Sequence, residues 1–233
     1  MSAVSNAGPI PGSVMIELGG EQLILLPQKA AFWPRERMLI IADIHFGKAA
    51  AFRSWGIPVP RGTTSENLQA LDELIVLTGA DHVLFLGDFL HAKAAHAAST
   101  QAAMLAWRER RRDLVLTLVR GNHDAHAGDP AAALGIDLVD EPYTVGPLAF
   151  CHHPDITTID GEHYVLAGHV HPAYVLATRF DTLRLPCFLA GPRRMILPSF
   201  GAFTGGHTVR PERGERVFVT SGEAVHGVGK SVR

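Results

Sequence analysis

Short apolar runs alternate with amphipathic segments through the first half of the chain. Four runs have the length of strands, at Glu21–Leu26, Met38–Ala42, His82–Leu86 and 114–119. Helix-like segments separate the later runs, at 48–55, 63–79 and 94–112. Continuous apolar runs are typical of strands that are covered on both faces. The alternation of strand and helix predicts a mainly parallel sheet with crossover helices.

The segment 63–79 gives a clear helix pattern. Leu68, Leu71, Leu74 and Ile75 recur with the 3.6-residue period of one buried helix face. The stretch 63–66 begins with a threonine and has a glutamate three residues later, which is the spacing of a capping box. We therefore expect this helix to begin at the box and to end near a glycine at position 79.

The pattern changes after Asp137. Short β-like runs broken by Gly and Pro lie at 143–150, Tyr164–Ala167, 174–177, 183–189, 195–197 and 216–219. No repeat or low-complexity linker divides the chain, so we expect these strands to belong to the same domain. The prediction is one α/β domain over residues 15–221, with flexible tails at 1–14 and 222–233.

The composition of the chain narrows the classes of protein to which it could belong. The chain has 233 residues, of which 47% are hydrophobic and 19% charged, enough for a sizeable core. A net charge of -2 gives no global electrostatic attraction to nucleic acid. The start has no secretory signal pattern, and the apolar runs are too short to span a membrane. The only two cysteines, Cys151 and Cys187, favour buried free thiols in a reducing, cytoplasmic compartment.

Side chains that bind metals follow five of the apolar runs. They are Asp43 and His45; Asp88; Asn122 with His123 and Asp124; His152; and His169 with His171. A set of imidazole, carboxylate and amide ligands without a thiolate favours Mn, Fe or Zn. We predict one metal site, built at the edge of a sheet.

The same residues indicate a reaction class. Two adjacent cations repel each other unless an anion bridges them, and a lone strand-end carboxylate such as Asp88 suits that position. Two-metal sites, with ions about 3.5 to 4 Å apart, present a bridging hydroxide for in-line attack on phosphorus. The chain has no glycine-rich loop with Lys-Ser/Thr for nucleotide phosphates and no Gly-x-Ser-x-Gly elbow, and hydride transfer and serine hydrolysis have no support.

The order of these blocks resembles the calcineurin-like metallophosphoesterase superfamily. The matching blocks are Asp43-x-His45, Gly87-Asp88, Gly121-Asn122-His123-Asp124, His152 and Gly168-His169-x-His171. Three further stretches, 42–48, 56–62 and 197–206, resemble the bacterial ligase-associated phosphoesterases, a family of DNA-damage-response endonucleases. The resemblance implies a four-layer α/β/β/α sandwich with mixed sheets and a dinuclear-metal phosphodiesterase that acts on DNA in repair.

The resemblance also implies roles for single residues. Asp43, His45 and His171 would hold one metal, Asn122, His152 and His169 the other, and Asp88 would bridge them. Manganese is the metal expected first. His123 would lie beside the phosphate as a proton donor or transition-state stabiliser, with Asp124 as a possible orienting neighbour. The implied partners are a DNA substrate, an ATP-dependent DNA ligase and an associated helicase or exonuclease.

Several alternatives stay open. The substrate could be a nucleotide or another small phosphoester, and a non-catalytic docking module is a second rival. We favour His152 over its neighbour His153 as the ligand, and His91 could line the cleft or be an ordinary loop histidine. Arginines at 108 and 110–112 fit a solvated helix end better than a DNA contact. Arg193 and Arg194 are the better candidates for phosphate contact.

Overall fold

The computed structural model describes residues 10–59, 62–155, 161–177, 179, 181–202 and 204–229. Seven strands form a first sheet in sequence order. They are β1 (Val14–Leu18), β2 (Glu21–Leu26), β3 (Ala30–Trp33), β4 (Met38–Ala42), β5 (His82–Leu86), β6 (Val115–Val119) and β7 (Asp137–Val139). Neighbours are antiparallel from β1 to β4 and parallel from β4 to β7, so the sheet is mixed.

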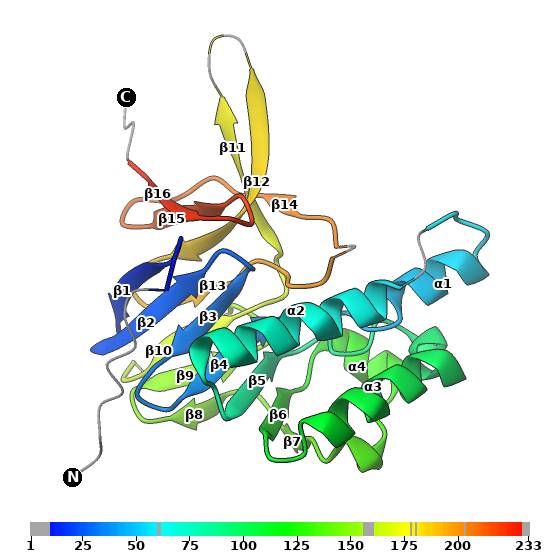
Figure 1. The fold of residues 1–233 in the computed structure, drawn as a ribbon. Coiled ribbons are helices and arrows are strands. Elements are labelled where there is room, and N and C mark those ends of the chain that lie inside the picture. Colours follow the sequence, from blue (N-terminus) through cyan, green and yellow to red (C-terminus); the bar gives the residue numbers. More distant parts are fainter. Residues whose placement is uncertain are drawn as a thin grey trace.

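Helices cover one face of this sheet (Figure 1). They are α1 (Lys48–Ser54), α2 (Thr63–Thr78), α3 (Ala98–Arg110) and α4 (Asn122–Ala127), with two short 3-10 helices, η1 (Lys93–His96) and η2 (Ala132–Leu134). The predicted buried face of α2 is confirmed. The predicted capping box is wrong: the cap residue is Gly62, with φ 100°, and no side chain caps the helix. The helix predicted at 94–112 is in fact two helices, because Ala97 has an extended backbone.

A second sheet contains the remaining nine strands. They are β8 (Tyr143–Val145), β9 (Leu148–Cys151), β10 (Tyr164–Ala167), β11 (Pro172–Ala177), β12 (Thr182–Ala190), β13 (Arg194–Ile196), β14 (His207–Thr208), β15 (Arg216–Thr220) and β16 (Val225–Val228). The run predicted at 143–150 is a hairpin that turns at Gly146, where φ is 54°. β16 lies inside the predicted C-terminal tail and pairs with β15, so the domain extends at least to Val228, beyond the predicted boundary at residue 221.

The two sheets pack face to face, with Trp33, Phe150 and Phe188 among the apolar side chains between them. In β4 the alternate residues Ile40 and Ala42 face the second sheet, and Leu39 and Ile41 face the helices. This explains why the whole run is apolar. On its other face the second sheet carries two small apolar clusters, one around Cys187 and one formed by Ala149, Cys151, Val165 and Ala167. Within the described ranges, helices lie on the first sheet alone, so the second helical layer that the resemblance implied has no counterpart there.

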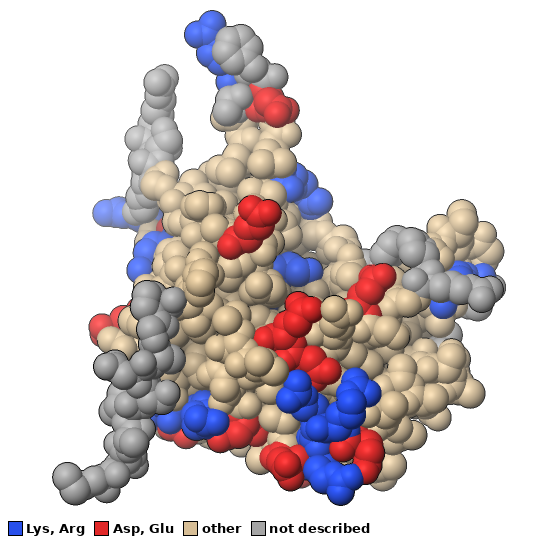
Figure 2. All heavy atoms as spheres, viewed as in Figure 1, with Lys and Arg blue, Asp and Glu red and all other residues tan. Residues whose placement is uncertain are grey.

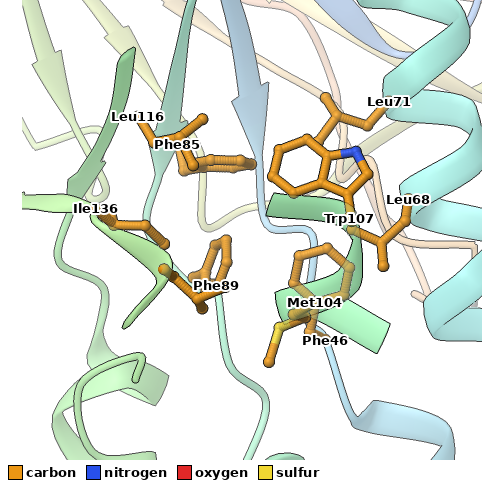
Figure 3. A pocket seen from close by; sticks show the side chains of 10 residues that line it. Phe46, Leu68, Leu71, Phe85, Phe89, Met104, Trp107, Leu116 and Ile136 are labelled. Atoms are coloured by element: carbon orange, nitrogen blue, oxygen red, sulfur yellow. The ribbon is translucent and has the colours of Figure 1, made fainter. Parts of the chain in front are cut away.

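The helical side of the core anchors the loops that follow β4 and β5. Phe46 and Phe89 point into this core (Figure 3), and their ring centroids lie 5.0 Å apart. The gap between the side chains drawn in Figure 3 holds about 10 Å3 and has an apolar lining. A space of this size without polar partners does not hold water stably. It is a packing gap, and the packed rings of Phe46 and Phe89 beside it hold the backbone next to His45 and Asp88 in place.

Candidate metal centre

The predicted metal-binding residues meet at one edge of the sandwich. β4, β5 and β6 are parallel and end next to Asp43, Asp88 and Asn122. In the second sheet β9 and β10 are parallel, and they end next to His152 and His169. Parallel strands release their carboxyl ends at the same edge of a sheet, and packing the two sheets brings both edges together. Residues far apart in sequence thus share one site.

The backbone at these strand ends is unusual. Seven described residues other than glycine have positive φ, and five of them are Asp43, His45, Asp88, His169 and His171, at 46° to 69°. Such left-handed conformations are costly for residues with a Cβ atom and are maintained only by surrounding contacts. Hydrogen bonds supply these contacts: the N–H of His45 donates to the Asp88 carbonyl oxygen at 2.9 Å.

A first group of donors contains Asp43, His45, Asp88 and His171. One ligand atom from each lies within 4.8 Å of all the others. His45 Nε2 is 3.3 Å from His171 Nε2 and 3.8 Å from Asp88 Oδ2. Asp43 Oδ1 is 3.5 Å from His171 Nε2. Three of the four residues are buried, so their lone pairs converge in a region with little water.

A second group lies beside the first. His152 Nε2 is 2.8 Å from Asn122 Oδ1 and 3.0 Å from His169 Nδ1. The same nitrogen is 3.4 Å from Asp88 Oδ1. Asp88 therefore reaches both groups, one with each carboxylate oxygen. Burial and the adjacent His152 and His153 lower the pKa of His169, which favours the neutral imidazole that metals bind.

The donor set fits divalent cations. Asp43 is fully buried, and its Oδ1 has no hydrogen-bond partner among the described residues. A buried carboxylate oxygen without a hydrogen-bond donor is unfavourable unless a cation neutralises it. The surrounding donors are imidazole nitrogens and carboxylate or amide oxygens, the ligands of Mn, Fe and Zn sites. The groups are thus His/Asp metal-ligand clusters.

Two glycines permit the close packing at this edge. A Cβ atom added to Gly87 would overlap three atoms of the His152 side chain, and Gly87 also has a φ of 67°. A Cβ atom on Gly168 would lie 2.8 Å from Asp43 Oδ2. Any larger residue at Gly87 would displace the imidazole of His152. The glycines that directly precede Asp88 and His169 are therefore required, because neither position has room for a Cβ atom.

Asp124 binds backbone groups. Its carboxylate accepts the N–H of Leu90 at 2.9 Å through Oδ1 and the N–H of Gly121 at 3.0 Å through Oδ2. It is 1% exposed, and burial raises its pKa above the ordinary value. Asp124 thus joins the loops that carry Asp88 and Asn122. The side chain of His123 lies outside what the structure describes, so no contact between these two residues is assigned.

His153 and His91, whose roles the sequence leaves open, both lie at the site. His153 belongs to the same ligand group as His152 and His169, but it is half-exposed and its Nδ1 is 2.7 Å from Glu141 Oε1. The Glu141 carboxylate also accepts the N–H groups of His152 and His153. No sequence pattern predicts this contact, because Glu141 lies in a connection with no motif. The ring of His91 packs edge-on against that of His45, with centroids 5.2 Å apart.

Three of the four arginines at the end of α3 are paired with acids, and Arg108 donates to the backbone carbonyl oxygens of Arg111 and Leu114. Arg110 and Arg111 both contact Asp72 of α2, and Arg112 contacts Glu109. Figure 2 shows basic and acidic side chains interleaved on this face. The interpretation as an ordinary helix end is therefore preferred to a DNA contact. Of the other candidate pair, Arg194 donates to the carbonyl oxygen of Pro154 at 2.9 Å, just after the His152 segment.

Comparison with known proteins identifies the family to which the chain belongs. The sequence model of the calcineurin-like phosphoesterases matches residues 36–171, which contain all of the clustered donors. The chain belongs to this family. It is also similar to the crystal structure of the Pseudomonas putida nuclease MPE, with 42% identity, a TM-score of 0.81, and coverage of 93% of this chain and 100% of that one. The chain is thus a metallophosphoesterase homologous to a nuclease.

These comparisons confirm the α/β fold with two mixed sheets packed as a sandwich. No curated protein sequence matches the chain significantly. Over the described ranges, every helix is too short or too polar to cross a membrane. Cys151 and Cys187 are buried free thiols, and burial raises the pKa of each to about 12, so both side chains stay protonated and unreactive at neutral pH.

Proposed function

We propose that this metallophosphoesterase is a dinuclear-metal DNA endonuclease that acts in DNA repair. The observation that carries the proposal is the position of Asp88, whose two carboxylate oxygens lie beside the two separate donor groups. The second support is the 42% identity with a nuclease over 93% of the chain. A mononuclear or purely structural site would need neither a shared carboxylate nor donors on both sides of it.

The proposed ligand assignment follows the two groups. Asp43, His45 and His171 would hold one cation, Asn122, His152 and His169 would hold the other, and Asp88, whose two oxygens lie beside the two groups, would serve both. Manganese is the proposed metal, because the set mixes carboxylate and amide oxygens with imidazole. The bound cations would supply an activated nucleophile at neutral pH and offset the charge that develops on the phosphoryl oxygens.

The remaining roles belong to protein side chains. His123 directly follows the proposed ligand Asn122, and we assign it as the proton donor to the leaving oxygen of the phosphodiester. Asp124 is a positioning residue, because its carboxylate holds the backbone N–H of Gly121 and thereby the start of α4. Substrate affinity depends on local basic groups, since the net charge of -2 supplies no general attraction to DNA.

We also propose the domain extent, the cellular location and the functional partners of the enzyme. Residues 14–228, from β1 to β16, form one domain, supported by the apolar core that joins residues of both sheets. The free cysteines support a reducing, cytoplasmic location. An ATP-dependent DNA ligase, with an associated helicase or exonuclease, is the proposed functional partner. Co-purification of the tagged chain with the ligase, before and after nuclease treatment, tests that association separately from catalysis.

The activity is tested with three substrates in the presence of manganese: bis-p-nitrophenyl phosphate, p-nitrophenyl phosphate and single-stranded circular DNA. The expected result is cleavage of the diester and of the circle, with loss of both in Asp88→Asn. Turnover of the monoester alone would overturn the proposal in favour of a small phosphoester substrate. An inert protein that still binds manganese would leave a docking module as the better interpretation.

A further inference from the structure

A pocket of about 190 Å3 lies beside the metal centre on the side of His171. The other lining residues are Lys29, Pro172, Ala173, Arg184, Leu185, Pro186, Pro198, Ser199, Thr204, Gly205 and Gly206. Apart from Lys29, its lining residues come from the loop between β13 and β14 and from the base of the β11–β12 hairpin. Because His171 belongs to both features, a group bound in the pocket would be adjacent to a group bound at the metals.

The pocket is positively charged. The described residues that line it include Lys29 and Arg184 but none that is acidic. Arg184 is exposed, donates from Nε to Thr208 Oγ1 at 3.0 Å, and contacts the carbonyl oxygen of Gly206 through Nη2. A guanidinium has five N–H donors, so these two contacts leave others for a ligand. In a chain with a net charge of -2, such a site attracts anions locally.

Lys29 lies deeper in the same pocket. Its ammonium group donates to the carbonyl oxygen of Phe200 at 2.8 Å, and no carboxylate is among the lining residues. Burial lowers its pKa to about 8, so the group remains mainly protonated at neutral pH. A partly buried cation held only by neutral carbonyl groups gains electrostatic stabilisation when an anion arrives. Lys29 and Arg184 thus favour the same type of ligand.

A hydroxyl group completes the set of donors. Thr204 Oγ1 is buried, lines the pocket and has no hydrogen-bond partner among the described residues. Buried hydroxyl groups are nearly always hydrogen-bonded, so an unpartnered one next to two cations indicates an acceptor supplied by a ligand. The rest of the lining is largely apolar and includes three prolines. The pocket is smaller than the roughly 300 Å3 of the smallest typical ligand sites, which suits one phosphate with part of its sugar.

We propose that this pocket binds the phosphodiester group that neighbours the scissile one in a nucleic-acid strand, with Arg184, Lys29 and Thr204 as its hydrogen-bond donors. This inference rests on the proposed function. It explains how a nearly neutral protein holds a polyanion in register, since the second phosphate is bound at a fixed position beside His171. A free phosphate or a mononucleotide presents the same chemistry, and the experiment below separates these sources.

The test uses short thymidine oligonucleotides and bis-p-nitrophenyl phosphate, which has a single phosphate. For Arg184→Ala and for Thr204→Val, the ratio of kcat/KM on the oligonucleotide to kcat/KM on the small diester should fall about tenfold, because one charge-assisted hydrogen bond is lost. Thr204→Val is included because Arg184 also contacts the loop that holds His171. Arg216→Ala, which removes a charge that stacks on Phe218 of β15, is the matched control and should leave the ratio unchanged.

Two further measurements identify the bound group. A neutral methylphosphonate placed next to the scissile phosphate should abolish the difference between wild type and Arg184→Ala. In wild type, the dependence of log KM on log salt should exceed that of Arg184→Ala by about 0.7, the value for one phosphate contact on a single strand. An unchanged ratio in both variants, or a difference that survives the methylphosphonate, would overturn the pocket assignment.

The outcomes also separate this inference from the proposed function. If wild type hydrolyses the small diester but no oligonucleotide, both the nucleic-acid function and the pocket assignment fail. If wild type cleaves the oligonucleotide and both pocket variants match it, only the pocket assignment fails. Inorganic phosphate should compete more strongly against wild type than against Arg184→Ala, because free phosphate and a strand phosphate use the same donors. Such competition without any fall in the oligonucleotide ratio of the two variants would assign the pocket to free phosphate and overturn the strand proposal.

Discussion

The backbone N–H of His169 donates to Asp43 Oδ2 at 2.9 Å, which joins the end of β10 in one sheet to the end of β4 in the other. Both residues have left-handed backbone conformations, with φ of 69° and 51°. The other oxygen of Asp43 points among imidazole nitrogens and has no hydrogen-bond donor among the described groups. Folding therefore assembles strained, buried donors in advance, and bound cations would stabilise that arrangement.

Metal binding is expected to raise the stability of the folded protein. A ligand that binds only the folded state at one hundred times its Kd adds about 2.7 kcal/mol. We therefore expect manganese to raise Tm strongly after chelation, and Asp43→Asn to lose most of that rise. Asp137→Asn, an exposed carboxylate on β7, is the control and should respond as wild type does. Equal shifts in the three proteins, measured by differential scanning calorimetry, would contradict the assignment of Asp43.

His123→Ala is expected to retain its metals and lose turnover. Removal of a proton donor lowers kcat by about 10²- to 10⁴-fold, while the ligands on other strands stay in place. Metal content by elemental analysis and kcat on bis-p-nitrophenyl phosphate measure the two effects separately. The control is His226→Ala, an exposed histidine on β16. A variant with wild-type kcat would exclude His123 from the reaction.

Much of the fold was predictable because its signals are local. Strands β2, β4, β5 and β10 lie where the apolar runs placed them, and the buried face of α2 follows the helical period. Strand β3 was missed because its four residues sit between Pro27 and Pro34 in a stretch interpreted as a loop. β16 was missed because its pairing with β15 compensates for a weak, glycine-containing sequence.

The sequence predicts which residues form the site, but it does not predict how they are arranged in space. The sequence placed metal-binding side chains at strand ends, and the structure brings them together as two donor groups. The left-handed backbone of five of these residues is set by contacts between strands, so no local pattern indicates it. The contact of Glu141 with His153 and the pocket around Arg184 likewise depend on segments that meet only after folding.

Lys29 is expected to make stability depend on pH in alkaline solution. Burial lowers its pKa from 10.5 to about 8, so between these values the unfolded chain binds a proton that the folded protein does not. The stability of wild type relative to Lys29→Met should be constant below about pH 8 and then rise by about 3 kcal/mol towards pH 10.5. Urea unfolding of both proteins across this range provides the measurement. A difference that stays flat would mean that Lys29 titrates normally.

Gly87→Ala is expected to disrupt the second donor group. The added Cβ atom would overlap the ring of His152, and the left-handed φ of 67° adds strain. The strain costs about 1 to 2 kcal/mol, and the overlap adds about 1 to 3 kcal/mol. Gly20→Ala is the matched control, because Gly20 has φ of 79° but nothing within 4 Å of the added atom. Only Gly87→Ala should lose manganese binding as well as stability. Equal losses in the two variants, by urea unfolding and metal titration, would show that backbone strain alone explains this glycine.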